Sequence, residues 1–144
     1  MDLFSPETTA SGTELAWLVG YRFRSLTKRD YDWVLTFENG AFLAISCLWR
    51  LIEAGRICRT SLDEGQQFGL PAPVDAAGEV NCQLSGALVA STVVRPGLLD
   101  IELGFSTGHI FQVIPDSSGY EAWNLVNGSG QRRIAVGGGD LAIV

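Results

Sequence analysis

Hydrophobic and polar residues alternate most regularly over residues 99–114, and this alternation predicts a β-hairpin. The apolar positions of its first strand are Leu99, Ile101, Leu103 and Phe105. Thr107-Gly108 is typical of a two-residue hairpin turn, because glycine readily adopts the positive φ that such turns need. A two-residue turn would place Phe111 opposite Gly104 on the partner strand.

A second hairpin is predicted earlier in the chain. The strand Trp33–Phe37 is followed by Asn39-Gly40, a strong signal for a two-residue turn, and then by a strand over residues 41–47. Further strands are predicted over residues 21–26, 49–53, 56–60, 132–136 and 141–144, with another after Gly86.

Two short helices are predicted, and strands follow each of them. The first covers residues 15–19 after a capping sequence at 11–14. The second begins after Asp75 and ends at Gly86. Another capping sequence, at 118–121, predicts one further helical turn.

The two halves of the chain repeat the same order of signals. The Phe-x-x-Gly sequence of the earlier hairpin recurs in the later one, and the strand that starts at Trp49 has a counterpart at Trp123. We therefore predict an internal duplication of residues 11–60 and 75–136, joined by the loop 61–74.

Together these elements predict a single domain over residues 1–144 of the α+β class, with mainly antiparallel strands. It would consist of two pseudo-symmetric halves, each with a short helix followed by about five strands. Phe111 and Val113 fall on the predicted wet face of their strand, so both faces of the sheet would be partly buried. Three arrangements would cover the second face of the sheet: the helices, the other half, or a homodimer that hides Leu43, Phe111 and Val113.

Composition and charge then narrow the choice of partner. Hydrophobic residues make up 47% of the chain and charged residues 18%, which argues against disorder. The net charge is -6 and the pI is about 4.6, which disfavours nucleic acid as a partner and favours a basic one.

Neither cysteines nor targeting signals point to a special environment. Cys47, Cys58 and Cys82 form no CxxC pair and no cluster with histidine, so neither a zinc site nor a disulfide framework is predicted. Residues 1–14 lack the basic start and apolar core of a signal peptide, and no apolar run approaches a membrane span. We expect a cytoplasmic protein without membrane contact, metal or cofactor.

No set of residues predicts catalysis, so the expectation leans towards a protein that is not an enzyme. His109 is the only histidine, and the predicted turn places it opposite Ser106 as a solvated residue at the hairpin tip. The glycine run at 137–139 lacks the Lys-Ser/Thr of a phosphate-binding loop, and we interpret it as a bend before the last strand.

Two polar clusters supply the candidate binding residues. Asp63, Gln66 and Gln67 lie in a loop bounded by glycine and proline, where binding residues are common. Tyr120 and Glu121 combine an aromatic ring with a carboxylate, as interaction hot spots often do. Each cluster also has a structural interpretation. The first can be a capped surface turn, and Glu121 in the second can be part of a helix cap.

The sequences GQQFGLPAPVDAA, GYEAWNL and GGGDLA resemble a family of small uncharacterised bacterial proteins, mainly from actinobacteria. Members pair a Trp-Arg-Leu strand with a later Tyr-Glu-Ala-Trp motif, and the resemblance extends over most of the chain from Trp17. It implies no activity and no catalytic residue. Some small bacterial proteins of this kind look like immunity proteins of toxin systems, and the acidic balance suits that role.

The leading hypothesis is a non-enzymatic domain that binds another protein, such as a basic toxin, in the manner of an immunity protein. The alternative is a small-ligand-binding or enzymatic domain with a pocket between the two halves. Residues 63–68, Tyr120 and Glu121 would line that pocket.

Overall fold

The computed structural model describes residues 15–130, 132–136 and 139–143, and its helical elements are short. They are the 3-10 turns η1 (Ala16–Leu18) and η2 (Ser61–Asp63) and the helix α1 (Ala76–Gln83). The strands are β1 (Phe23–Lys28), β2 (Trp33–Phe37), β3 (Phe42–Ile45), β4 (Leu48–Glu53), β5 (Arg56–Thr60), β6 (Val89–Val94), β7 (Ile101–Phe105), β8 (Ile110–Ile114), β9 (Trp123–Val126), β10 (Arg132–Ala135) and β11 (Leu141–Ile143).

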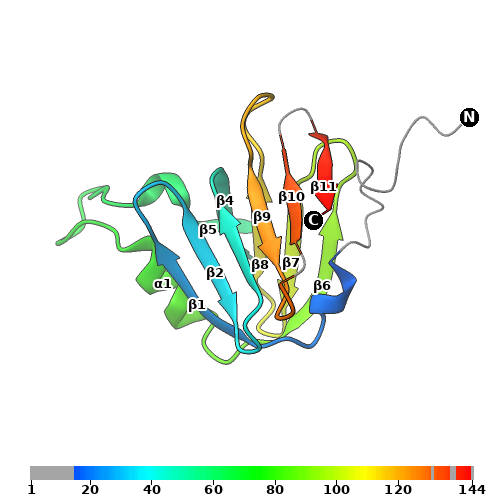
Figure 1. The fold of residues 1–144 in the computed structure, drawn as a ribbon. Helices are drawn as coiled ribbons and strands as arrows, with labels where there is room; N and C mark the ends of the chain where they lie inside the picture. The colour runs from blue at the N-terminus through cyan, green and yellow to red at the C-terminus, as the bar shows by residue number, and fades with distance from the viewer. Residues whose placement is uncertain (1–14, 131, 137–138, 144) are drawn as a thin grey trace, which may run out of the picture.

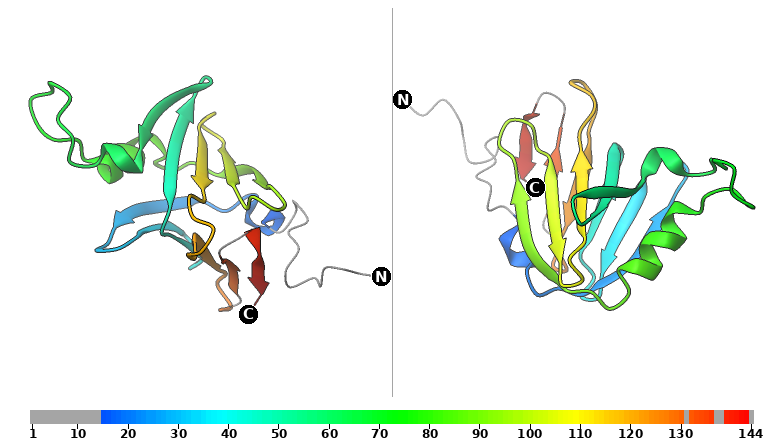
Figure 2. Two further views of the ribbon diagram at one scale, coloured as in Figure 1. Left: turned by 90° about the horizontal axis from the view of Figure 1, so that it is seen from above. Right: turned by 180° about the vertical axis from the view of Figure 1, so that it is seen from behind.

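The strands form two antiparallel sheets that pack as two layers (Figures 1 and 2). One sheet has six strands in the order β1-β2-β3-β9-β10-β11, and the other has five in the order β5-β4-β8-β7-β6. The predicted α+β class with mainly antiparallel strands is therefore confirmed.

Aromatic side chains join the two layers in the core. The Trp49 ring of the five-stranded sheet meets the Trp33 ring of the six-stranded sheet edge to face, with 5.1 Å between ring centroids. On its other side Trp49 stacks on Phe111 of the neighbouring strand at 5.2 Å. Such rings bury a large apolar area and prefer these two geometries, so the contact holds the layers together.

The helix α1 closes the side of the molecule where the edge strands β1 and β5 lie (Figure 1). The Asp75 carboxylate caps it by accepting the Gly78 N–H at 3.0 Å, as predicted. The Asn81 side chain accepts the Leu26 N–H and donates to the Leu26 carbonyl, which satisfies the exposed edge of β1. Among the described residues, no helix is long and apolar enough to cross a membrane.

The predicted turn length of both hairpins is wrong by one residue. The Phe37 N–H donates to the Ala41 carbonyl and the Phe105 N–H to the His109 carbonyl, both at 2.9 Å, so each loop has three residues. The glycine that ends each loop has a φ near +90°, the conformation that a three-residue loop with a bulge requires. The glycine is readable from the sequence, whereas the loop length is not.

This shift places every later side chain of β8 on the opposite face from the one predicted. Phe111 lies opposite Leu103 and not opposite Gly104, and both Phe111 and Val113 point into the core. Leu43 is buried there as well. Of the three sources of cover that the sequence left open for these side chains, the packing of the two sheets within one chain supplies it.

The helical turn predicted at 118–121 is also wrong. The Ser117 hydroxyl accepts the N–H groups of Gly119 and Tyr120, at 3.1 and 3.2 Å, and the chain bends without forming a helix. The hydroxyl of Ser117, and not that of Ser118 as predicted, thus accepts the hydrogen bonds of these N–H groups. The capping sequence predicted at 11–14 lies outside the described residues.

Two buried tryptophans, one in each sheet, differ in their hydrogen bonding. Trp49 and Trp123 are both 0% exposed. The Trp123 Nε1–H donates to the Leu99 carbonyl at 2.8 Å, whereas the Trp49 Nε1–H has no partner within the described residues. Leu99 has a φ of +59°, which is strained for a leucine, so the Trp123 bond supports a strained backbone.

This difference in hydrogen bonding predicts that replacing Trp49 and replacing Trp123 by phenylalanine lower the free energy of unfolding by different amounts. Trp123→Phe is expected to lower the free energy of unfolding by about 1–3 kcal/mol more than Trp49→Phe, because only the former leaves a buried carbonyl without its donor. Urea denaturation of both variants measures the two free energies. Equal losses would contradict the role assigned to the Trp123 bond.

Candidate functional site

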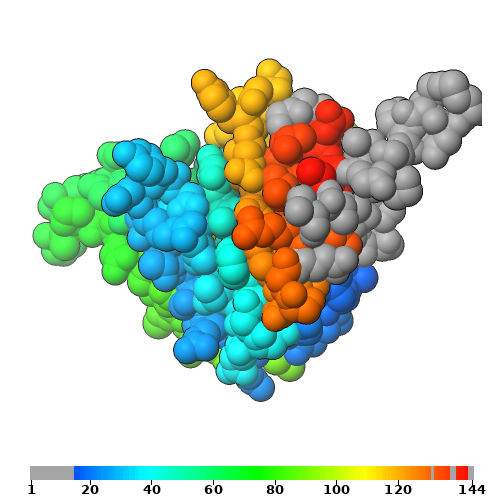
Figure 3. Space-filling model, viewed as in Figure 1, coloured from blue at the N-terminus to red at the C-terminus, as the bar shows by residue number. Residues whose placement is uncertain are grey.

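A surface hollow at one end of the sheets, here named the acidic hollow, brings together Tyr120 and Glu121. It has a volume of about 430 Å³ and is lined by Tyr31, Ser46, Asp116, Ser117, Tyr120, Glu121 and Ala122. These residues come from the β1–β2 turn, the β3–β4 connection and the segment 115–122 between β8 and β9, which lie at the top in Figures 1 and 3.

Backbone hydrogen bonds anchor the segment 115–122 at its end. The Ser46 N–H donates to the Ala122 carbonyl, and the Ala122 N–H donates to the Ala135 carbonyl, both at 2.8 Å. The Ser117 hydroxyl fixes the bend that precedes Tyr120. The segment therefore presents its side chains from a backbone tied to the six-stranded sheet.

Two tyrosines of the acidic hollow project into solvent. Tyr31 is 95% exposed and Tyr120 is 79% exposed, so neither ring contributes much to the core. Tyr31 is not among the binding residues predicted from the sequence, although an aromatic residue between Asp30 and Asp32 in a turn between strands is a usable signal. Exposed aromatic rings grouped beside polar residues are typical of interaction surfaces.

Two carboxylates of the acidic hollow carry charge without a partner. Within the described residues, neither Asp116 nor Glu121 has a hydrogen bond or ion pair to its carboxylate. Arginines pair, in contrast, with the carboxylates of Asp32, Glu38, Asp63, Glu79 and Glu102. Uncompensated negative charge of the chain is thus found beside the two exposed tyrosines.

Cys47 lies behind the acidic hollow and is no candidate nucleophile. Burial raises the pKa of its thiol to about 12, and the negative charge of Asp116 adds to this effect. The thiol therefore stays protonated near neutral pH, and a protonated thiol is unreactive.

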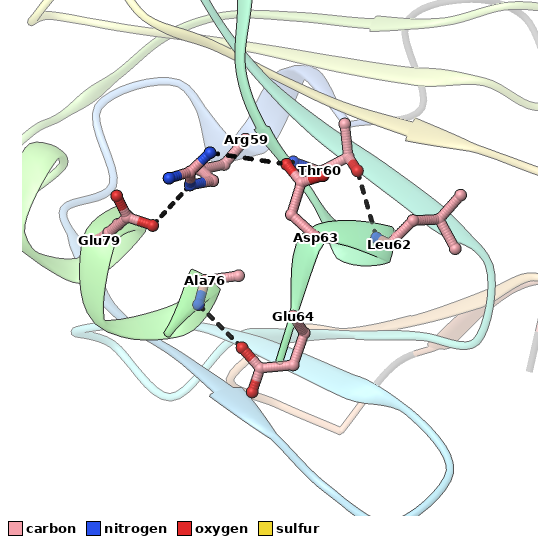
Figure 4. Close-up of polar contacts among 7 residues, drawn as sticks. All are labelled: Arg59, Thr60, Leu62, Asp63, Glu64, Ala76 and Glu79. Carbon is pink, nitrogen blue, oxygen red and sulfur yellow. Dashed lines mark hydrogen bonds and ion pairs between the residues drawn. The ribbon is translucent and has the colours of Figure 1, made fainter. Parts of the chain in front are cut away.

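The other candidate cluster holds its own loop together (Figure 4). The Asp63 carboxylate accepts the Thr60 N–H at 3.0 Å, and the Thr60 hydroxyl accepts the Leu62 N–H at 3.2 Å, which forms a capping box around η2. Arg59 lies 4.0 Å from Asp63 and donates to Glu79 at 2.6 Å. The structure thus gives Asp63 a local structural role.

Gln66 and Gln67 also act within the loop. The Gln66 carbonyl accepts the Val74 N–H at 2.7 Å, and the Gln67 side chain donates to the Leu70 carbonyl at 2.9 Å. The side chain of Gln67 thus has a role within the loop, whereas the Gln66 contact uses only its backbone.

The structure does not bring the two candidate clusters together. A hollow beside the loop is lined by Arg59, Leu70, Ala72, Pro73, Val74, Asp75, Gly78, Glu79 and Cys82, and it shares no residue with the acidic hollow. In Figure 1 the loop projects at the left, away from the segment 115–122 at the top. Among the described residues, the two clusters thus lie beside separate hollows.

His109 is 6% exposed, so the prediction of a solvated turn residue is wrong. Its Nδ1 lies 2.8 Å from the Thr107 hydroxyl, and its Nε2 lies 2.8 Å from Gln83 Oε1 and 3.1 Å from Glu53 Oε2. The Glu53 carboxylate can only accept a hydrogen bond, so Nε2 faces it as a donor. The three-residue loop turns His109 inward, where it links the β7–β8 hairpin to α1 and the β4–β5 hairpin.

The three thiols are expected to differ in reactivity. Cys82 is exposed and should react with iodoacetamide at about pH 8 in the folded protein, whereas Cys47 should react only after unfolding in urea. Cys58 is half-buried and should react slowly, since burial raises its pKa. Mass spectrometry of the labelled peptides measures the order, and fast labelling of Cys47 would contradict the described packing behind the acidic hollow.

The described residues contain no group of three or more His, Cys, Asp or Glu side chains placed to hold a metal ion. Comparison of the chain with protein-family models, with curated proteins and with solved structures gave no match. The case for a function therefore comes from the geometry and charge of the site.

Proposed function

We propose that the chain is a non-enzymatic protein-binding domain that recognises a basic partner protein at the acidic hollow. One observation carries the proposal: Asp116 and Glu121, two carboxylates without partners in the described part of the chain, line the same hollow as two exposed tyrosines. A lysine or arginine side chain of the partner would enter this hollow.

The chemistry of the acidic hollow matches such a side chain. Carboxylates form charge-assisted hydrogen bonds with lysine and arginine, and tyrosine rings attract cations, by about 0.5–1 kcal/mol at exposed sites. The net charge of -6 adds a long-range attraction that speeds the encounter with a basic protein. A basic protein toxin has this chemistry, and binding that blocks it would make the chain an immunity-like protein.

We also propose that residues 11–60 and 75–136 are equivalent halves that exchange strands. In one sheet β1-β2-β3 is followed by β9-β10, and in the other β6-β7-β8 is followed by β4-β5, the corresponding order. A reciprocal pair of hydrogen bonds supports the equivalence: Phe23 N–H donates to Ala87 and Val89 N–H to Tyr21, both at 2.8 Å.

The proposed duplication bears on function because the halves differ at the site. The connection between β3 and β4 consists of residues 46–47, whereas the corresponding connection between β8 and β9 consists of residues 115–122. The longer connection supplies Asp116, Tyr120 and Glu121. The second half would therefore supply most of the binding residues, and the first half would add Tyr31 and Ser46.

Capture of the partner tests the proposal. The immobilised chain is expected to retain a basic protein from extracts of the cells that express it, and to release it when salt rises from about 0.05 M to about 0.5 M. With the purified partner, the double variant Asp116→Asn, Glu121→Gln and the variant Tyr120→Ala should each bind about tenfold more weakly, as measured by calorimetry.

Glu38→Gln is the matched control, because Glu38 is an exposed carboxylate outside the acidic hollow. It should leave the affinity unchanged. A partner that binds the double variant as tightly as the unaltered chain, or retention of small molecules without any protein, would refute the proposal.

A further inference from the structure

The loop between η2 and α1 exposes an uncharged apolar surface, which we name the apolar loop (residues 65–74). Every residue from 65 to 73 is exposed, and no residue of the apolar loop is charged. Phe68 is 64% exposed and Leu70 is 41% exposed. The loop projects from the rest of the molecule, at the left in Figure 1 and in the left view of Figure 2, and at the right in the right view of Figure 2. Exposed apolar surface of this kind marks interaction sites.

Hydrogen bonds at its base hold the apolar loop in one conformation. The Gly65 N–H donates to the Val74 carbonyl at 3.0 Å, and the Val74 N–H donates to the Gln66 carbonyl at 2.7 Å. Just outside this neck, the Glu64 carboxylate accepts the Ala76 N–H at 2.8 Å (Figure 4). The loop is therefore shaped before any partner binds, which lowers the entropy cost of binding.

The tip of the apolar loop places Phe68 in an unfavourable backbone conformation. The Leu70 N–H donates to the Gln67 carbonyl at 2.7 Å, and the two residues between them have positive φ, +49° for Phe68 and +76° for Gly69. This is a type I′ turn, whose first central position favours Asn, Asp or Gly. A phenylalanine there is strained, and its largely exposed ring gains little burial in return.

We propose that Phe68 is the anchor of a docking surface formed by the apolar loop, and that its partner is a protein with an apolar pocket rimmed by basic side chains. An ordered phenyl ring on a prearranged turn has the properties of an interaction hot spot. This inference is independent of the acidic hollow, because the two surfaces share no residue.

The charge around the base of the apolar loop defines the rim of the partner's pocket. Asp63, Glu64, Asp75 and Glu79 stand there against one arginine, Arg59. This negative surplus complements a basic rim and opposes docking on a membrane with anionic lipids. The tip itself is uncharged, so the floor of the pocket must be apolar.

Phe68→Asn separates a docking role from a structural one. Asparagine tolerates positive φ, so the variant is expected to be more stable than the unaltered chain, with Tm raised by about 2–4 °C. A ring that contributes to folding would give the opposite result. A fall in Tm for Phe68→Asn would overturn the proposal.

Binding is tested with p-benzoylphenylalanine at position 68 as a photo-crosslinker in cells that express the chain. The crosslinked protein is identified by mass spectrometry and purified, and its affinity is measured. Phe68→Asn is expected to weaken its binding about tenfold or more. Leu98→Asn is the control, because Leu98 is equally exposed at 64% but lies outside the apolar loop, and its affinity should be unchanged.

Three other outcomes would overturn the proposal: a crosslink only to a second copy of the chain, no crosslink to any protein, or Phe68-dependent retention on vesicles of phosphatidylcholine and phosphatidylglycerol. A purified partner that binds Phe68→Asn with unchanged affinity would also refute it. The Asp116→Asn, Glu121→Gln variant is expected to retain the crosslink from position 68. Failure at one surface can therefore be told from failure at the other.

Discussion

The contact of Trp49 with Trp33 joins the two sheets, and the position of the acidic hollow depends on it. Trp33 pairs across the six-stranded sheet with Ile45, and Ile45 pairs with Trp123, so this row of core residues marks one end of the sheet. The hollow residues Tyr31, Ser46 and Ala122 lie within two positions of that row along the chain. The packing of these core residues therefore determines where the acidic hollow forms, although they do not line it.

The sequence was informative about elements and less so about how they meet. Alternation and capping residues located the strands and α1, because these signals are local. The hairpin register was wrong since Gly40 and Gly108 fit both a two-residue and a three-residue loop. The same error put Phe111 on the wrong face and His109 in solvent, although both are buried.

The candidate site was predictable only in part for a related reason. Tyr120 and Glu121 stood out because an aromatic residue beside a carboxylate is a local pattern. Tyr31 joins them from far along the chain, and only the strand order places its turn beside the segment 115–122. Asp63 and Gln67 looked equally suited to binding, but their hydrogen bonds within the loop account for them. In that loop Phe68 is exposed and has a positive φ, and contacts among the residues that the structure describes do not account for it.

The central claim is that a cationic side chain binds in the acidic hollow, and a nuclear magnetic resonance titration with a tetralysine peptide tests it without a known partner. The largest chemical-shift changes are expected on Tyr31, Ser46 and residues 116–122, and they should vanish in the Asp116→Asn, Glu121→Gln variant. Changes as large around Glu38 or Glu53, or changes that persist in that variant, would contradict binding of a cationic side chain in the acidic hollow.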